Sequence, residues 1–201
     1  MQRREFLITT AASMAALLGT AGCGTTSTAM ATKDSPSPAS SGPSERRSRI
    51  ATEAEASLSR LYAMTPGSRE LVSKARGVLV FPSVIAAGLG IGGEYGDGVL
   101  RTGNSIEGYY NLAALSVGLQ AGAQSRAIVF LFMTSDALQK FRSSEGWSVG
   151  ADASVALLKV GANGAVDVNT VTGPVVAFVM TNAGLMANLT VEGTKIMPFK
   201  D

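Results

Sequence analysis

Glycine recurs at every second position through much of residues 84–100. The even-numbered positions from 88 to 98 hold Gly88, Gly90, Gly92, Glu94, Gly96 and Gly98. Because alternate residues of a β-strand share one face, a strand here would present almost bare backbone on one side. Two explanations are open: strong curvature with tight packing of another element on that face, or a groove for a ligand or an acyl chain.

Two further stretches repeat this alternation of small residues. In residues 117–124 and 149–155, glycine, serine and other polar residues alternate with valine, leucine and alanine. Glycine weakens helix interiors, and the chain holds 23 glycines in 201 residues, so strands and tight turns are expected to dominate. The predicted fold class is α+β. It combines a mainly antiparallel, strongly curved β-sheet, sandwich- or barrel-like, with one or two N-terminal helices and a short helix near residues 135–141.

Helical spacing marks the region before the strands. Apolar residues recur every three or four positions there, which predicts a helix from about Ser48 to Met64. The Pro-Gly pair at 66–67 ends it, and residues 68–75 are expected to form a second, shorter helix. Ser135 is the predicted N-cap of the helix near 135–141. Strands are predicted at residues 77–81, 84–100, 117–124, 127–133, 149–155 and 161–173, with a closing antiparallel pair at 174–180 and 185–192.

Residues 1–22 are predicted to be a cleaved export signal. A positive start is followed by an apolar run that is too short for a membrane-spanning helix of ~20 apolar residues. The stretch Arg3-Arg4-Glu5-Phe6-Leu7 resembles the twin-arginine export signal. The small residues at 19–22 and the cysteine after them resemble a bacterial lipobox, in which Cys23 receives acyl chains after cleavage. The alternative is an ordinary secretory signal with an incidental cysteine.

Residues 23–45 are predicted to be a lipidated cysteine followed by a disordered tether. Threonine, serine, alanine and proline dominate this stretch, and such a composition cannot bury enough apolar surface to offset chain entropy. Two or more acyl chains on Cys23 would anchor the protein stably. Gly24 follows Cys23, where an Asp would favour the inner membrane in many bacteria, so we expect the outer membrane, facing the periplasm. Residues 46–201 remain as the folded domain.

The composition excludes several classes of protein. The chain has no histidine and a single cysteine, which removes Ser-His-Asp catalysis, His-containing metal sites and any intramolecular disulfide. Removing residues 1–22 takes away Arg3, Arg4 and Glu5, and this lowers the net charge from +2 to +1. Because basic and acidic residues are nearly equal in number, the charge gives no case for nucleic-acid binding. No cofactor, metal or catalytic residue is predicted.

Three arginines, Arg46, Arg47 and Arg49, cluster at the start of the first predicted helix. This is the wrong end for the helix dipole, which favours anions at the N-terminus. Two interpretations remain: the arginines contact lipid phosphates, or they form a solvated edge of the tether.

Two patterns suggest chemistry but have simpler explanations. Residues 88–93 satisfy G-x-G-x-x-G, yet the residues that follow cannot begin a good helix, so a dinucleotide site is not expected. Glu94, Asp97 and Asp152 could serve a carboxylate-based hydrolase, although Gly-Asp-Gly is first of all a turn signal. Asp152 is expected to be partly buried on a strand, where backbone N–H groups or a basic partner would hold it.

Five segments in order resemble the SYLF domain. They are residues 74–82 (KARGVLVFP), the glycine-rich residues 88–98 with Tyr95, Tyr109-Tyr110, residues 118–124 (GLQAGAQ) and residues 150–155 (GADASV). The resemblance covers roughly residues 50–199. SYLF domains are lipid-binding modules of eukaryotic membrane-traffic and actin-associated proteins and of many bacterial lipoproteins. By this resemblance, eukaryotic members bind phosphoinositides, partly through a basic N-terminal helix, and some bind actin. The positions that match a basic headgroup site are Arg46, Arg47, Arg49, Lys74 and Arg76.

The leading hypothesis is therefore a non-enzymatic envelope lipoprotein whose periplasmic domain binds lipid or phospholipid headgroups. Its expected partner is membrane lipid, as acyl anchor and as ligand. The alternative is a structural lipoprotein of the outer membrane that holds an envelope protein and has no lipid ligand. A carboxylate-based hydrolase is the third hypothesis.

Overall fold

A computed structural model describes residues 42–158, 172–181, 184–185 and 191–199 of the chain. The side chains of residues 89–91, 116–123 and 184–185 lie outside that description. The predicted signal, Cys23 and the tether up to residue 41 also lie outside it, as does most of the strand predicted at 161–173. The described residues belong to one compact unit, Ser40–Asp201.

Three helices occur in the described part of the chain: α1 (Pro43–Met64), α2 (Ser68–Lys74) and α3 (Ser135–Ser143). Helix α1 begins five residues earlier than predicted, so the prediction of a disordered tether is wrong for residues 43–45. Proline suits the first turn of a helix because its missing N–H would have no partner there, and Glu45 in the same turn favours the dipole. The N-cap of α3 is Thr134 rather than Ser135, and its side chain accepts a hydrogen bond from the backbone N–H of Ala137.

Two long strands, β1 (Gly77–Thr102) and β2 (Ser105–Phe132), form an antiparallel hairpin that dominates the sheet. Each of them joins segments that the sequence predicted as separate strands. Pro82 was expected to end the first strand, but it falls in a β-bulge between Phe81 and Val84. A bulge tolerates proline because the extra residue needs no ladder hydrogen bond, so the strand continues past it.

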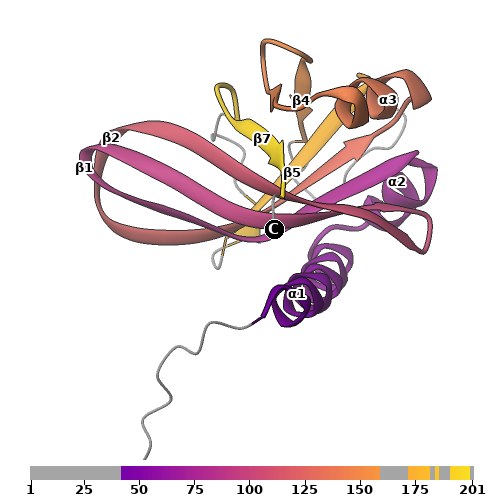
Figure 1. The fold of residues 1–201 in the computed structure, drawn as a ribbon, viewed down its shortest axis with the longest axis horizontal. Helices are drawn as coiled ribbons and strands as arrows, with labels where there is room; N and C mark the ends of the chain where they lie inside the picture. The colour runs from indigo at the N-terminus through magenta and orange to yellow at the C-terminus, as the bar shows by residue number, and fades with distance from the viewer. Residues whose placement is uncertain (1–41, 159–171, 182–183, 186–190, 200–201) are drawn as a thin grey trace, which may run out of the picture. The chain divides into compact units, whose positions relative to one another are not determined.

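Shorter strands pair with β2 near both of its ends (Figure 1). β5 (Val175–Thr181) pairs antiparallel with the end of β2 and parallel with β4 (Val155–Leu157). β7 (Lys195–Pro198) pairs with residues 110–113 of β2, and β3 (Trp147–Ser148) pairs with β7. β6 (Gly184–Leu185) pairs antiparallel with β5, which confirms only the beginning of the closing strand predicted at 185–192. Residues 186–190 lie outside the described residues, and residues 191–192 are not in a strand. The α+β fold class and the mainly antiparallel, strongly curved sheet are thus confirmed, with β4–β5 as a parallel exception.

The glycine face of β1 is closely packed at Gly96 and Gly98. A Cβ atom on Gly98 would lie 2.5 Å from the ring of Phe81 and 2.8 Å from the carbonyl oxygen of Val80. A Cβ on Gly96 would lie 2.8 Å from the side chain of Val84 and 2.9 Å from the carbonyl oxygen of Ser83. The two ends of β1 therefore pack against each other, because the strand curls over. Gly88 and Gly90 flank a second bulge, which bends the hairpin further.

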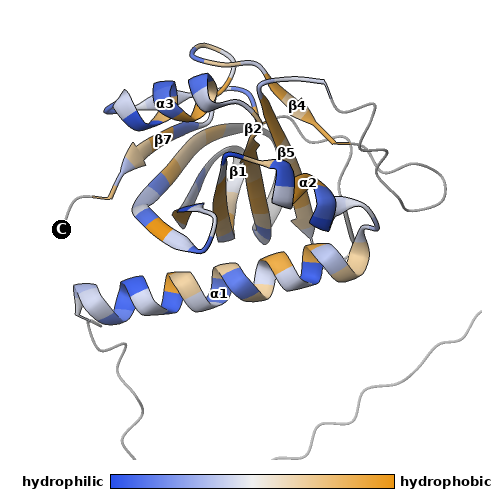
Figure 2. Cartoon of the chain, turned by 90° about the vertical axis from the view of Figure 1, so that its right-hand side faces the viewer, coloured by the Kyte–Doolittle hydropathy of each residue, from blue (hydrophilic) through white to orange (hydrophobic). Residues whose placement is uncertain are grey.

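Both faces of the sheet carry a hydrophobic core. Helix α1 covers one face with four buried residues, Ile50, Ala54, Leu58 and Leu61, whereas α3 lies on the opposite side (Figure 2). On the α3 side, Phe141 packs edge-on against Trp147 with ring centroids 5.5 Å apart. None of the helices in the described part of the chain has the length and apolar content needed to span a bilayer.

Candidate functional site

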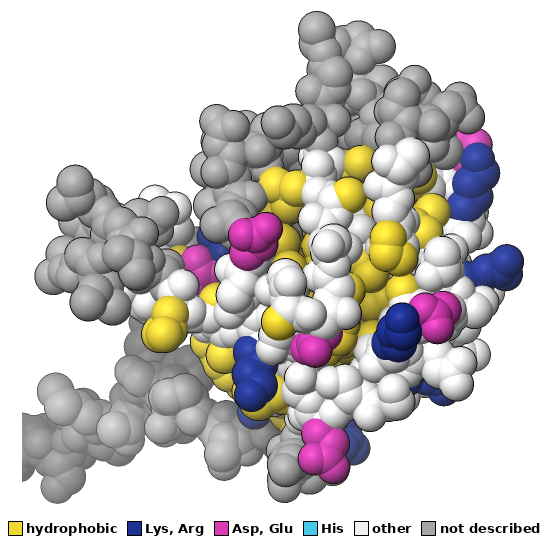
Figure 3. Space-filling view, turned by 90° about the horizontal axis from the view of Figure 1, so that it is seen from above, with side chains coloured by type: hydrophobic (Ala, Val, Ile, Leu, Met, Phe, Trp, Pro, Cys, Tyr) yellow, Lys and Arg dark blue, Asp and Glu magenta, His cyan; other side chains and the backbone are white. Residues whose placement is uncertain are grey.

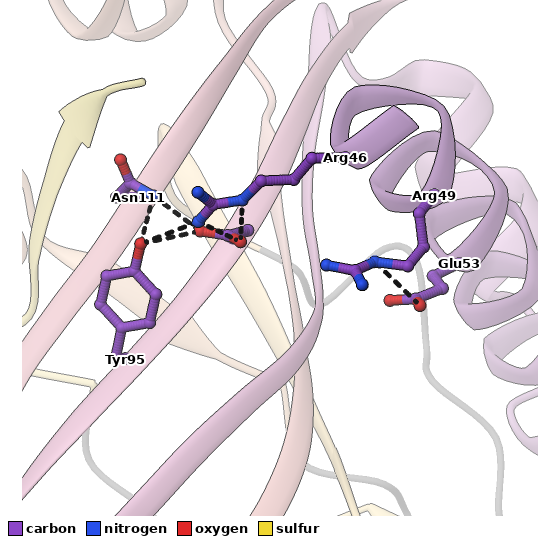
Figure 4. A network of polar contacts seen from close by, with 6 residues as sticks. Arg46, Arg49, Glu53, Tyr95 and Asn111 are labelled. Atoms are coloured by element: carbon purple, nitrogen blue, oxygen red, sulfur yellow. Dashed lines mark hydrogen bonds and ion pairs between the residues drawn. The ribbon is translucent and has the colours of Figure 1, made fainter. Parts of the chain in front are cut away.

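Arg46 fastens the first turns of α1 to strand β1. Its Nε and Nη2 atoms donate to the same oxygen of Asp97, at 3.0 and 2.7 Å, and its guanidinium stacks 4.6 Å from the ring centre of Phe199. The Tyr95 hydroxyl donates to the other oxygen of Asp97 at 2.9 Å, and Asn111 donates to both Asp97 and Tyr95 (Figure 4). These contacts tie the Nε and Nη2 atoms of Arg46 to the sheet.

The electrostatics of this network favour its present protonation states. The hydrogen bond to Asp97 raises the pKa of the Arg46 guanidinium above its ordinary value. Partial burial, reinforced by the hydrogen bond to Asp97, raises the pKa of the Tyr95 phenol. Arg46 therefore stays charged and Tyr95 stays neutral at physiological pH. The network has a structural role, because it holds α1 against β1.

The other basic side chains that were predicted to contact a lipid headgroup lie in two separate places. Arg47 lies over the ring of Tyr109 at 5.7 Å, and Arg49 forms an exposed pair with Glu53 at 3.8 Å. Lys74 forms an exposed pair with Glu70 at 2.8 Å. Helix α1 is 22 residues long, or about 33 Å, and α2 follows its C-terminal end (Figure 2). The structure therefore does not bring Lys74 and Arg76 together with the arginines at the start of α1.

Arg76 lies at a different site, an open cleft of about 600 Å³. Its backbone N–H donates to the carbonyl oxygen of Phe132 at 2.7 Å, which holds it beside the ends of β1 and β2. Its side chain is exposed and has no carboxylate partner among the residues that the structure describes. The cleft is lined by Arg76, Thr102, Ser135, Leu138, Gln139, Arg142 and Ser143.

The three candidate carboxylates do not form a catalytic pair. Glu94 and Asp97 are three residues apart on β1, so they lie on opposite faces, and each is held by an arginine: Arg126 for Glu94 and Arg46 for Asp97. Among the described residues, no group of three or more acidic side chains gathers as a metal site would require. The geometry therefore adds nothing to the hydrolase hypothesis.

The prediction for Asp152 is wrong in its burial and its secondary structure. Residues 149–153 form a turn rather than a strand, because Gly150 adopts a φ of +92° and the backbone N–H of Asp152 donates to the carbonyl oxygen of Ser148. Asp152 is exposed. Its carboxylate accepts a hydrogen bond from the backbone N–H of Ser148 at 2.6 Å, which is the kind of partner that the sequence predicted.

Residues 113–201 match a family described as Ysc84, Las17-binding protein actin regulator. The resemblance to the SYLF domain is thus confirmed for residues 113–201. The match begins within β2 and continues to the C-terminus, so it covers the second part of the region over which the sequence resembles SYLF domains. No curated protein matches the chain.

Three segments that are far apart in sequence build the cleft. The wall on α3, with Ser135 and Arg142, lies inside the family match, whereas Arg76 and Thr102 precede it. Sequence reasoning identified Arg76 but missed Arg142 and Thr102. Arg142 lies in the last turn of α3, where a basic residue is expected for the helix dipole, so no local pattern sets it apart.

Charges of both signs are interspersed on the face of the SYLF domain shown in Figure 3. Basic and acidic side chains lie next to one another there, around hydrophobic side chains. This arrangement agrees with the near-neutral net charge. On this face, anion binding would therefore depend on a local site rather than on a broad basic surface.

Proposed function

We propose that this chain is a non-enzymatic, lipid-anchored envelope protein whose SYLF domain binds acidic lipid headgroups at the membrane surface. The observation that carries the proposal is Arg76, which lines an open cleft and has no carboxylate partner within the described residues. Arg46, Arg49 and Lys74, by contrast, are each engaged by a carboxylate. In this proposal Cys23 carries the anchor in the outer membrane, and the domain faces the periplasm.

The packing of α1 limits how such a domain can meet a bilayer. The apolar stripe of α1 is buried against the sheet, with Ala54 and Leu61 fully buried. An amphipathic helix that inserts in a membrane needs that stripe free. The folded domain is therefore expected to bind headgroups through polar contacts and not to insert α1.

Vesicle sedimentation tests the lipid-binding part of the proposal. The full chain carrying Cys23→Ser, which has no acyl anchor, is mixed with vesicles of phosphatidylcholine alone or of phosphatidylcholine with phosphatidylglycerol. We expect at least about tenfold tighter binding to the anionic vesicles, and we expect salt to weaken it because exposed charges are screened beyond ~10 Å at 0.1 M. Equal binding to both vesicles, or none to either, would contradict this part of the proposal.

Fractionation of cells tests the anchor independently. Cys23→Ser should leave the protein exported but soluble, because acyl chains contribute ~0.8 kcal/mol per buried CH₂ and supply most of the membrane affinity. Ser27→Ala, a change within the same tether, serves as the control and should leave the protein in the membrane fraction. A Cys23→Ser protein as firmly bound as the wild type would show that the anchor lies elsewhere.

A protein-interaction role is the second candidate. It is supported by the family description, which names Las17 binding and actin regulation. Under this alternative the domain holds an envelope protein and has no lipid ligand. Failure of the vesicle assay with a normally anchored, folded protein would favour it.

A further inference from the structure

The cleft beside Arg76 is assembled from three parts of the chain that meet tightly. Gly77 has no side chain, so Leu138 of α3 can approach β1: a Cβ atom on Gly77 would lie only 2.7 Å from Cδ1 of Leu138. This close approach places α3 next to the residue before Gly77. The tip of the β1–β2 hairpin contributes Thr102. Leu138 thus adds an apolar residue to a cleft that also has two cationic ones, Arg76 and Arg142.

The polar groups that line the cleft are mostly hydrogen-bond donors. Arg76 and Arg142 supply two guanidinium groups, and Ser135, Ser143 and Thr102 supply hydroxyls. The hydroxyl of Thr102 is buried and has no hydrogen-bond partner within the described part of the chain. A buried hydroxyl without a partner is costly, so a small rotation toward a ligand oxygen would be favourable. No carboxylate lines the cleft.

One carboxylate nevertheless competes with a bound anion for Arg142. Glu107 of β2 lies outside the lining but pairs with Nη2 of Arg142 at 2.8 Å. The Arg142 side chain is 51% exposed, so this is a surface pair of small net stability. A dianion in the cleft could therefore draw Arg142 away from Glu107 at little cost.

From this arrangement we propose that the cleft binds a phosphate group, with Arg76 and Arg142 as its charged ligands and Glu107 as the competitor that Arg142 leaves on binding. Guanidinium groups match phosphate oxygens in a two-pronged geometry, and hydroxyls complete the shell. The phosphate can come from a lipid headgroup, in which case the inference rests on the proposed function, or from a soluble phosphate. The site chemistry is the same for both sources.

Titration with inorganic phosphate, followed by NMR of the full Cys23→Ser chain, tests the site itself. We expect shifts to concentrate at Arg76, Thr102 and residues 135–143. Arg76→Gln and Arg142→Gln, on separate elements, should each weaken phosphate binding about tenfold. Glu107→Gln should strengthen it by up to about fivefold, because it removes only a surface competitor. All three variants should melt like the parent, since these side chains are largely solvent-exposed or replaceable by an amide.

Charge-matched variants separate local contacts from the overall charge. Arg49→Gln removes one cation from α1, and Glu53→Gln removes its acidic partner, both outside the cleft. Phosphate affinity should change less than twofold in each. Equal weakening by Arg49→Gln and Arg76→Gln, or shifts that spread over the surface without the cleft residues, would overturn the proposal.

A vesicle-binding experiment identifies the source of the phosphate. The same variants are tested on vesicles of phosphatidylcholine with phosphatidic acid. Parallel loss of phosphate and vesicle binding in Arg76→Gln and Arg142→Gln supports a lipid headgroup in the cleft. Lost phosphate binding with unchanged or absent vesicle binding supports a soluble phosphate. Vesicle binding by a chain whose cleft takes no phosphate would leave the proposed function standing and reject this site.

Discussion

Replacing Gly98 with valine is expected to abolish folding or to lower the melting temperature sharply. Even a single Cβ at this position would lie 2.5 Å from the ring of Phe81, which is fully buried, and 2.8 Å from a backbone oxygen. Neither the ring nor the backbone can move without disturbing the core. Overpacking typically costs ~1–3 kcal/mol and sometimes more. A loss of ~3 kcal/mol lowers the melting temperature of a domain of this size by roughly 6–12 °C.

Graded and matched variants make the Gly98 experiment decisive. Gly98→Ala should already lower the melting temperature, because its single methyl meets the same contacts. Gly93 lies on the same strand, is exposed, and has open space where a Cβ would be added. Gly93→Val should therefore change stability by no more than about 0.5 kcal/mol. A Gly98→Val protein that melts like Gly93→Val would show that the two ends of β1 do not pack as described.

The second large effect is expected at the buried ion pair between Glu94 and Arg126. Their side chains are only 8% and 10% exposed, and the Nε atom of Arg126 has no hydrogen-bond partner in the described residues. Glu94→Ala would leave the Arg126 charge buried and uncompensated. Breaking a buried pair in this way costs ~3–5 kcal/mol. Thermal or denaturant unfolding would measure the loss.

A double variant distinguishes the cost of an unpaired buried charge from the cost of lost packing. Glu94→Leu combined with Arg126→Met removes both charges and keeps much of the volume, so stability should recover to near the parent value or above it. Glu53→Ala breaks an exposed pair within α1 and should cost less than about 0.5 kcal/mol. If the double variant were as unstable as Glu94→Ala, packing rather than charge would be the cause.

Local patterns predicted the helices and the strand-rich character of the domain well. Apolar spacing over three or four residues placed α1 and α2, because a helix face depends on neighbours only a turn away. The same kind of reasoning split β1 at Pro82 and missed residues 105–116 of β2, since a bulge or a pairing partner is invisible within one segment. At residues 149–153 an alternating pattern predicted a strand, but Gly150 in the left-handed region made a turn.

The sequence by itself determined which residues are cationic, where the glycine face lies and which segments can become helix or strand. It also pointed to the SYLF family through the order of its motifs. Only the tertiary structure decided that Arg46 and Arg76, both predicted to contact a lipid headgroup, differ in role. Arg46 pairs with Asp97, 51 residues away, and holds α1 against β1. Arg76 meets α3 across a cleft and keeps its charge exposed. The reason is physical: the partner of a charged side chain is set by how the curled hairpin brings distant segments together, and no local sequence pattern encodes that distance.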